Sequence, residues 1–179
     1  TFLFVGRVTP NKGHDHLLKF LYYYHKIDPA ARLIITGQYY GFEPYLYKLN
    51  EMITRLRLEN VHCVGHVSHQ ELCTYYRLAD LFTCFSLHEG FCVPLLESMY
   101  FDLPILAVRG TAIEDTLAGA GMVLAEFDPL EAAETAAKII SDQNLLSKIV
   151  SGQRERLRCF ERSMIEPVLL EQLAQVGAE

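Results

Sequence analysis

The sequence has no tryptophan, no excess of positive charge and no long apolar run. Among its 179 residues, 16 are Lys or Arg and 22 are Asp or Glu, which gives a formal net charge of −6. Proteins that bind nucleic acid usually carry a basic face, so this balance argues against a nucleic-acid partner. No apolar stretch approaches the roughly 18 residues of a membrane span, so a transmembrane segment is not expected.

Cysteine is sparse and is not arranged in pairs. The count is odd, no Cys-x-x-Cys pair occurs, and Cys63 and Cys84 lie in apolar runs, where cysteine behaves as a small hydrophobe. We therefore expect no disulfide framework and a reducing, cytoplasmic compartment. The first residues show no basic segment followed by an apolar one and a cleavage site, so no signal peptide is expected. The histidines lack metal-ligand spacing to Cys or carboxylate neighbours, so no metal site is expected.

Half of the residues are apolar or aromatic, and the length fits one domain with a substantial core. Six short apolar runs alternate with stretches of helical period. Continuous runs of four or five apolar residues are typical of strands buried on both faces of a parallel sheet. The runs are residues 2–5, 33–36, 61–64, 81–85, 105–108 and 122–125.

The segments between the runs repeat apolar residues at intervals of three and four, as amphipathic helices do. Ser68 with Glu71 and Ser163 with Glu166 match the capping-box pattern, and Asp128, followed by proline, matches an N-cap. From about residue 142 onward, strand signals are missing and two further helices are predicted. The helical segments before that point are 17–24, 46–56, 72–79 and 130–140.

This alternation predicts an α/β fold. The expected architecture is a Rossmann-like, doubly wound parallel sheet of about six strands, flanked by helices on both faces. Ligands of such sheets bind at the carboxyl ends of the strands, near the point where the strand order reverses. The loops that follow the apolar runs are therefore the candidate sites.

The loop after the first run, residues 6–13, contains two glycines, Arg7, Lys12 and a predicted helix start. Helix N-termini favour anions, and Arg and Lys donate charge-assisted hydrogen bonds to phosphate. The loop matches neither the Walker pattern nor the Gly-x-Gly-x-x-Gly dinucleotide fingerprint. Taken alone, this loop fits both a phosphate-binding site and an ordinary solvated loop.

The loop after the fourth run carries two carboxylates eight positions apart, Glu89 and Glu97. Pro94 is expected to open a helix, which places Glu97 one turn inside it and leaves the amides of residues 91–93 facing the ligand side. Carboxylates accept hydrogen bonds from vicinal hydroxyls, and amides at a helix start bind phosphate or sugar oxygens. Together they suit a sugar and a ribose, although each glutamate alone also fits a helix cap or a solvated helix residue.

Read together, these loops resemble the C-terminal, donor-binding domain of retaining glycosyltransferases of family 4, which have the GT-B fold. The resemblance rests on Gly-Arg and Lys-Gly in residues 6–13, on Gly-x-Val at 65–67 and on the Glu-x7-Glu signature from Glu89 to Glu97. It continues through Pro104 to Asp128. Cys92 departs from the family pattern, which often has glycine there.

The resemblance implies a role for each matched residue. Arg7 and Lys12 would bind the donor diphosphate, and Glu89 would contact hydroxyls of the transferred sugar; these three form the expected catalytic set. Glu97 would hold the ribose hydroxyls, and Val67 would contact the base through its backbone. The other expected donor-binding residues are Gly6, Ser86, Gly90, Phe91, Cys92 and Val93. No metal or other cofactor is implied, because the cations and the helix N-terminus would stabilise the leaving group.

For the whole chain, the resemblance implies a nucleotide-sugar binding domain over residues 1–179, without the N-terminal acceptor domain. The chain would be an excised domain or half of a split enzyme. The expected reaction transfers a hexose from a nucleotide diphospho-sugar to a polysaccharide or glycolipid with retention, and the isolated domain is expected to be inactive. The full-length enzyme would be cytoplasmic, with peripheral contact at the inner face of the membrane. A GT-B sugar-nucleotide epimerase and a non-catalytic nucleotide-binding module are the alternatives.

Overall fold

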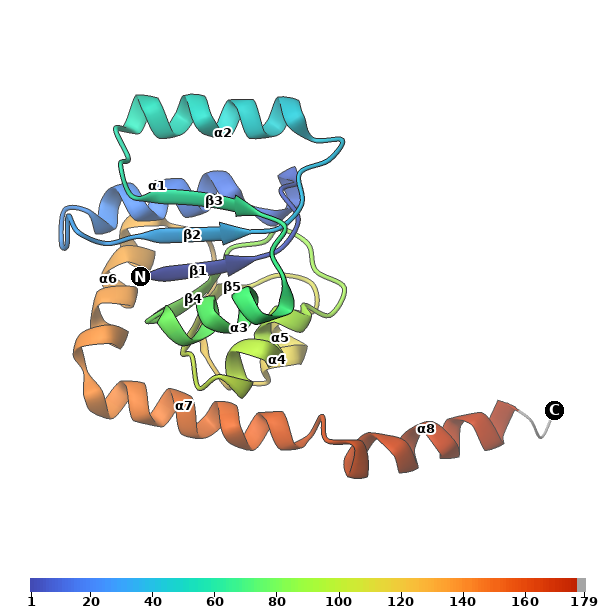
Figure 1. Cartoon of the computed structure of the whole chain (residues 1–179). Helices are drawn as coiled ribbons and strands as arrows, with labels where there is room; N and C mark the ends of the chain where they lie inside the picture. Colours follow the sequence, from blue (N-terminus) through green and yellow to red (C-terminus); the bar gives the residue numbers. More distant parts are fainter. Residues whose placement is uncertain (177–179) are drawn as a thin grey trace.

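A computed structural model describes residues 1–176 of the chain. Six parallel strands form one sheet in the order β3-β2-β1-β4-β5-β6 (Figure 1). The predicted fold class is confirmed, and each strand begins at the predicted residue and ends within one residue of the prediction. The strands are β1 (Phe2–Val5), β2 (Leu33–Thr36), β3 (Val61–Gly65), β4 (Leu81–Cys84), β5 (Ile105–Val108) and β6 (Met122–Leu124).

The helices begin largely where the sequence signals them. Ser68 and Glu71 form the predicted capping box, and Asp128 accepts hydrogen bonds from the two amides that open the next helix. The capping box at Ser163 is wrong, because the last helix already begins at Arg162, whose guanidinium pairs with Glu166 at 2.8 Å. The helices are η1 (Pro10–Lys12), α1 (His14–Tyr24), α2 (Glu43–Leu56), α3 (His69–Leu78), α4 (Val93–Tyr100), α5 (Ile113–Leu117), α6 (Pro129–Ser141), α7 (Gln143–Arg158) and α8 (Arg162–Val176).

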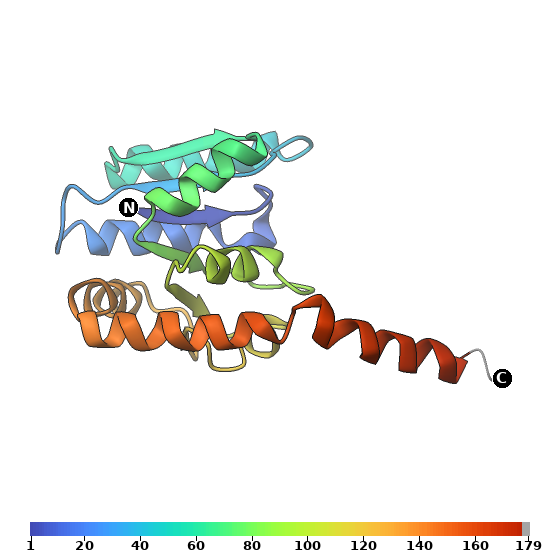
Figure 2. The ribbon, with the colours of Figure 1, turned by 60° about the horizontal axis from the view of Figure 1, so that its bottom comes forward.

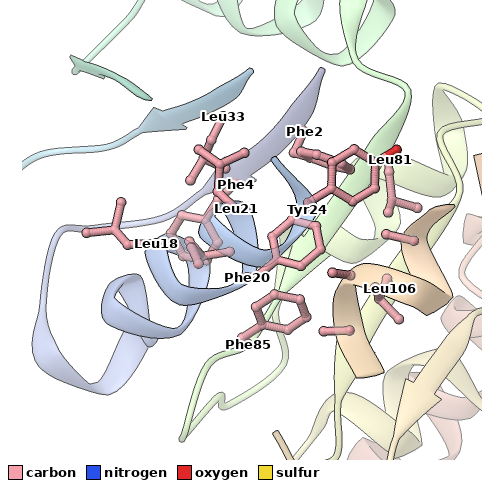
Figure 3. Close-up of a cluster of buried hydrophobic side chains, with 14 of the residues drawn as sticks. Phe2, Phe4, Leu18, Phe20, Leu21, Tyr24, Leu33, Leu81, Phe85 and Leu106 are labelled. Carbon is pink, nitrogen blue, oxygen red and sulfur yellow. The ribbon is translucent and has the colours of Figure 1, made fainter. Parts of the chain in front are cut away.

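One face of the sheet packs against α1, α2 and α6. Alternate residues of β1 point to this face, and the ring of Phe2 lies edge-on to Phe20 and Tyr24 of α1, with centroids 4.8 and 4.6 Å apart (Figure 3). Burial of one such side chain contributes about 1.5–3 kcal/mol. This aromatic cluster fixes α1, and therefore the loop that enters it, against the centre of the sheet.

The other face packs against α3, α4 and α5, with Leu3 of β1 and Phe82 of β4 at its centre. Helices on both faces explain why the central strands are apolar at consecutive positions. The prediction of burial on both faces is wrong for β3, where His62 and Cys63 are exposed. The reason is position: β3 is an edge strand, and an apolar run does not reveal which strand will lie at the edge.

The C-terminal part forms the two helices predicted after residue 142. The first, α7, packs against α4 and α6, whereas α8 extends away from the body (Figures 1 and 2). Much of the apolar surface of α8 is exposed. The side chains concerned are Met164, Ile165, Val168, Leu169, Leu170 and Leu173. Among the helices of residues 1–176, none has the length and apolar character that crossing a bilayer requires.

Candidate functional site

The strand order reverses between β1 and β4, and the loops after these two strands lie side by side at the carboxyl edge of the sheet. The amide of Leu87 donates to the carbonyl of Asn11 at 2.8 Å. Gly13 has φ 66°, and a Cβ added there would lie 2.1 Å from the carbonyl oxygen of Phe85. Glycine is required at this position by both its backbone conformation and the close approach of the second loop.

Lys12 and Glu89 meet across these two loops. The Lys12 Nζ lies 2.6 Å from Glu89 Oε2, and the two side chains are 21% and 7% exposed. A carboxylate this buried needs a partner, because removing a charge from water costs several kcal/mol unless it is paired. The sequence predicted both residues at the strand ends, and the structure brings them into direct contact.

The backbone around Glu89 is fixed by the segment after β5. The Thr111 hydroxyl donates to the carbonyl of Glu89 and accepts from its amide at 2.8 Å, and the Thr116 hydroxyl donates to the carbonyl of Phe91 at 2.7 Å. Neither threonine was predicted to have this role. A hydroxyl three residues after a strand end, at the ligand edge of the sheet, was the available signal.

The N-terminus of α4 presents unpaired amides beside Glu89. Cys92 is the N-cap in the left-handed conformation with φ 65°, and Pro94 occupies the first turn as predicted. Within residues 1–176, the amides of Phe91, Cys92 and Val93 have no hydrogen-bond acceptor. Such amides, together with the positive end of the helix dipole, are suited to bind an anion.

Glu97 lies one turn inside α4 and faces α3. Its Oε2 accepts a hydrogen bond from the hydroxyl of Tyr76 at 2.7 Å. Tyr76 is buried and stacks on Phe101 with centroids 5.2 Å apart, and burial followed by the bond to Glu97 raises its pKa well above the ordinary range. Both residues line a groove of about 460 Å³ between α3 and α4. The position of Glu97 one turn inside the helix was predicted, whereas Tyr76 was predicted only as part of the helical segment 72–79.

The other predicted donor-binding residues are spread along the same edge. Arg7 is exposed, with its guanidinium 5.8 Å above the ring of Phe42. The backbone of Gly6 is in close contact with Gly37, where an added Cβ would lie 1.9 Å from the Gly6 carbonyl oxygen. Val67 follows β3 at the edge of the sheet, and within residues 1–176 no hydrogen bond or ion pair joins Arg7 or Val67 to Glu89.

Two buried thiols complete the site. Cys84, at the end of β4, and Cys92 have their Sγ atoms 3.9 Å apart, and Cys84 also donates to the hydroxyl of the buried Ser86 at 3.7 Å. The hydrogen bond from Cys92 lowers the pKa of Cys84, while the same bond and burial raise that of Cys92. This pairing was not predicted, because Cys84 was assigned to the core and Cys92 to the amide site.

The sequence model of the family "Glycosyl transferases group 1" matches residues 1–156. The chain belongs to this family. A GDP-mannose:cellobiosyl-diphosphopolyprenol alpha-mannosyltransferase of Xanthomonas campestris is 30% identical over 145 residues, which cover 80% of this chain and 38% of that protein. One subunit of the phosphatidylinositol N-acetylglucosaminyltransferase from Arabidopsis thaliana is 25% identical over 94% of this chain and 41% of its own length.

The fold of this family member agrees with solved structures. Anabaena Alr3699/HepE, determined with UDP and glucose, superposes with a TM-score of 0.86 at 23% identity, over 97% of this chain and 48% of that one. The chain thus spans less than half the length of these relatives. The resemblance to the C-terminal domain of GT-B glycosyltransferases is confirmed, and both relatives named here are transferases.

Proposed function

We propose that the chain is the donor-binding half of an enzyme that transfers a hexose from a nucleotide diphospho-sugar with retention of anomeric configuration. The observation that carries this proposal is the Lys12–Glu89 pair at the strand-order reversal, with three unpaired amides beside it. A cation and free amides suit a diphosphate, and a buried carboxylate suits sugar hydroxyls. Glu97, eight positions further on, suits a ribose.

The Lys12–Glu89 pair suggests how the donor would engage. A diphosphate offers Lys12 a second anion, so Lys12 can turn toward the phosphates while Glu89 accepts hydrogen bonds from the sugar. When the glycosidic bond to phosphate breaks, negative charge grows on the departing diphosphate. Arg7, Lys12 and the backbone amides of residues 91–93 would stabilise that charge, which is the general form of electrostatic catalysis.

On this proposal, retention results from attack on the face that the leaving group occupies, and this half of the enzyme supplies no catalytic base. Transfer then needs no metal ion, because protein cations balance the diphosphate. The nucleotide base and the hexose stay undefined: one relative is named for GDP-mannose, whereas the Anabaena protein was determined with UDP.

We further propose that the acceptor binds to a second domain that faces this one. Two observations support this proposal: the chain spans less than half the length of these relatives, and α8 exposes several apolar side chains. The Xanthomonas and Arabidopsis relatives are named for a polyprenol-linked and an inositol-lipid acceptor. A glycolipid acceptor at the cytoplasmic face of a membrane is the corresponding proposal for the complete enzyme.

A melting-shift screen tests the donor assignment. Uridine, guanosine and adenosine diphosphates and their hexose conjugates are compared with the matching nucleosides and with inorganic pyrophosphate. A ligand that binds only the native state at tenfold excess over its Kd stabilises the protein by about 1.4 kcal/mol. We expect one diphosphate series to stabilise the chain and its nucleoside to do so far less. Equal shifts for every series and for pyrophosphate would contradict a nucleotide-sugar site.

A further inference from the structure

Two thiols and a carboxylate converge beneath Lys12. Cys84 comes from the end of β4, Cys92 is the N-cap of α4, and Glu89 lies in the loop between them. Their ligand atoms all lie within 4.8 Å of one another, and all three side chains are buried. Zinc and related ions are bound by this combination of thiolate and carboxylate ligands, whereas hard cations prefer oxygen alone.

The distance between the thiols distinguishes a metal site from a disulfide. Two thiolates on one tetrahedral zinc ion, with Zn–S bonds of about 2.3 Å, are about 3.8 Å apart. A disulfide requires about 2.05 Å. The Sγ atoms of Cys84 and Cys92 are 3.9 Å apart, so an ion could bridge them with little movement, whereas a disulfide would need the two sulfur atoms to come about 2 Å closer.

The charges around the cluster also fit a divalent ion. Two thiolates and the carboxylate of Glu89 carry three negative charges, so a divalent cation leaves one in surplus. The ammonium group of Lys12, 2.6 Å from Glu89, balances that surplus. When the ion binds, each thiol exchanges its proton for a bond to the metal, and two protons pass to the solvent.

We propose that Cys84, Cys92 and Glu89 form a site for a thiophilic divalent cation of the Zn²⁺ class. Three protein ligands leave a fourth position, which is open to water or to a phosphate oxygen. The bound ion also occupies the carboxylate of Glu89, which lies beside the amides of residues 91–93. If these groups bind the sugar donor, which rests on the proposed function, the bound ion competes with the donor and inhibits the enzyme.

Cadmium is the probe for the site itself, because cadmium–thiolate bonds absorb in the ultraviolet. Cys73 Sγ lies 3.6 Å from His69 Nε2 on α3 and could bind an ion of its own. The experiment therefore uses a background in which the three other cysteines, Cys63, Cys73 and Cys159, are replaced by serine. We expect one ion per chain, a thiolate absorption band, and release of two protons, measured from the buffer dependence of the binding enthalpy.

Two variants in this background remove one thiol each. Cys84→Ser keeps the size of the side chain, and Cys92→Gly suits the positive φ at that position. We expect the affinity for cadmium to fall at least about 100-fold in either variant, since even lost outer-shell contacts cost 10–100-fold. The site would be overturned if the background protein showed no thiolate band. It would also be overturned if both variants, shown to be folded by their melting curves, gave a band as strong as that of the background protein.

The competition is measured separately, with a nucleoside diphosphate titrated in the presence and absence of the ion. We expect the ion to weaken nucleotide binding in the background protein and not in Cys84→Ser, which also controls for ions bound by the nucleotide. Equal weakening in both proteins would overturn the competition. If cadmium binds as expected but no nucleoside diphosphate binds at all, the metal site stands and the proposed function fails.

Discussion

At the scale of single residues, the buried pair of Lys12 and Glu89 explains how the site is organised before a donor arrives. Exposed ion pairs contribute about 0–1 kcal/mol, but a buried carboxylate depends on its partner. Lys12 is the charged partner of Glu89, and the Thr111 hydroxyl accepts a hydrogen bond from the Glu89 amide. The carboxylate is therefore oriented in advance, at a position that a sugar hydroxyl could reach once phosphate engages Lys12.

Glu97 gives the first prediction. Glu97→Ala should weaken binding of a ribonucleoside diphosphate at least about tenfold, because a hydrogen bond to a charged group contributes about 1.5–3 kcal/mol. The 2′,3′-dideoxy analogue, which lacks the hydroxyl pair, should lose much less. Calorimetric titration of both ligands against both proteins makes the comparison. Equal losses for the two ligands would rule out the ribose role and leave Glu97 as the acceptor for Tyr76.

His14 gives a prediction about acid stability. It opens α1 and is fully buried against Phe4, and neither ring nitrogen has a partner within residues 1–176. Burial lowers its pKa from 6.5 to about 4. As the pH falls, the unfolded chain therefore binds a proton at this histidine before the folded chain does. The free energy of unfolding is unaffected by His14 above pH 6.5, and it decreases as the pH falls from there toward 4. A shift of this size corresponds to about 3 kcal/mol.

The measurement is urea unfolding of His14→Leu and the original chain between pH 4 and 7. The fall in unfolding free energy across this range should be smaller in His14→Leu by the part that His14 contributes, whereas the part due to His16, whose pKa burial also lowers, should stay. Tyr45→Phe, which changes a neighbouring ring 5.9 Å away and keeps the imidazole, is the control and should preserve the fall. An unchanged pH dependence in His14→Leu would contradict the assignment.

At the scale of elements, the loops after β1 and β4 are in close backbone contact at Gly13. Substitution of this glycine tests how much that contact contributes to stability. Gly13→Ala should destabilise the chain by about 3 kcal/mol, combining about 1 kcal/mol for an L-residue in the left-handed region with about 2 for overpacking. Gly41→Ala is the matched control, since Gly41 has φ 81° but open space around it. It should cost about 1 kcal/mol.

Chemical denaturation compares the two glycine variants. Because Gly13 adjoins Lys12 and touches the loop that carries Glu89, its variant should also weaken nucleotide binding, whereas the control should not. If the two variants lost similar amounts of unfolding free energy, the close contact between the loops would not contribute to stability.

The sequence predicts elements better than contacts between them. Strand ends were located to one residue because apolar runs and their flanking loops are local signals. The exposure of β3 could not be foreseen, since it depends on which strand ends the sheet. The contacts of Tyr76 with Glu97 and of Cys84 with Cys92 each join a predicted site residue to one that looks like an ordinary core position. Only the relative placement of α3, β4 and α4 brings these side chains together.

At the scale of the whole molecule, the exposed apolar surface of α8 and the greater length of the relatives fit the proposal that a second domain binds the acceptor. We predict that residues 1–179 bind the donor nucleotide and do not transfer its sugar. The assay follows labelled sugar from the stabilising donor to lipid-linked and polysaccharide acceptors. Robust transfer by the purified chain would show that no second domain is needed.

The central claim, that Arg7 and Lys12 bind the donor diphosphate, is tested most directly by a phosphate series. Nucleoside, monophosphate and diphosphate are titrated calorimetrically against the original chain and Arg7→Ala/Lys12→Ala at two salt concentrations. Lys48→Ala/Arg55→Ala, on α2, removes the same charge elsewhere and is the control. Each lost charge-assisted contact should cost about 1.5–3 kcal/mol, reduced by solvent screening.

We predict that the loss in Arg7→Ala/Lys12→Ala grows with phosphate number and that diphosphate binding by this variant depends less on salt. Binding should weaken rather than vanish, because the amides at the start of α4 still attract anions. The control should bind all three ligands as the original chain does. A loss by the same factor for nucleoside, monophosphate and diphosphate would contradict the claim and return the loop of residues 6–13 to an ordinary surface turn.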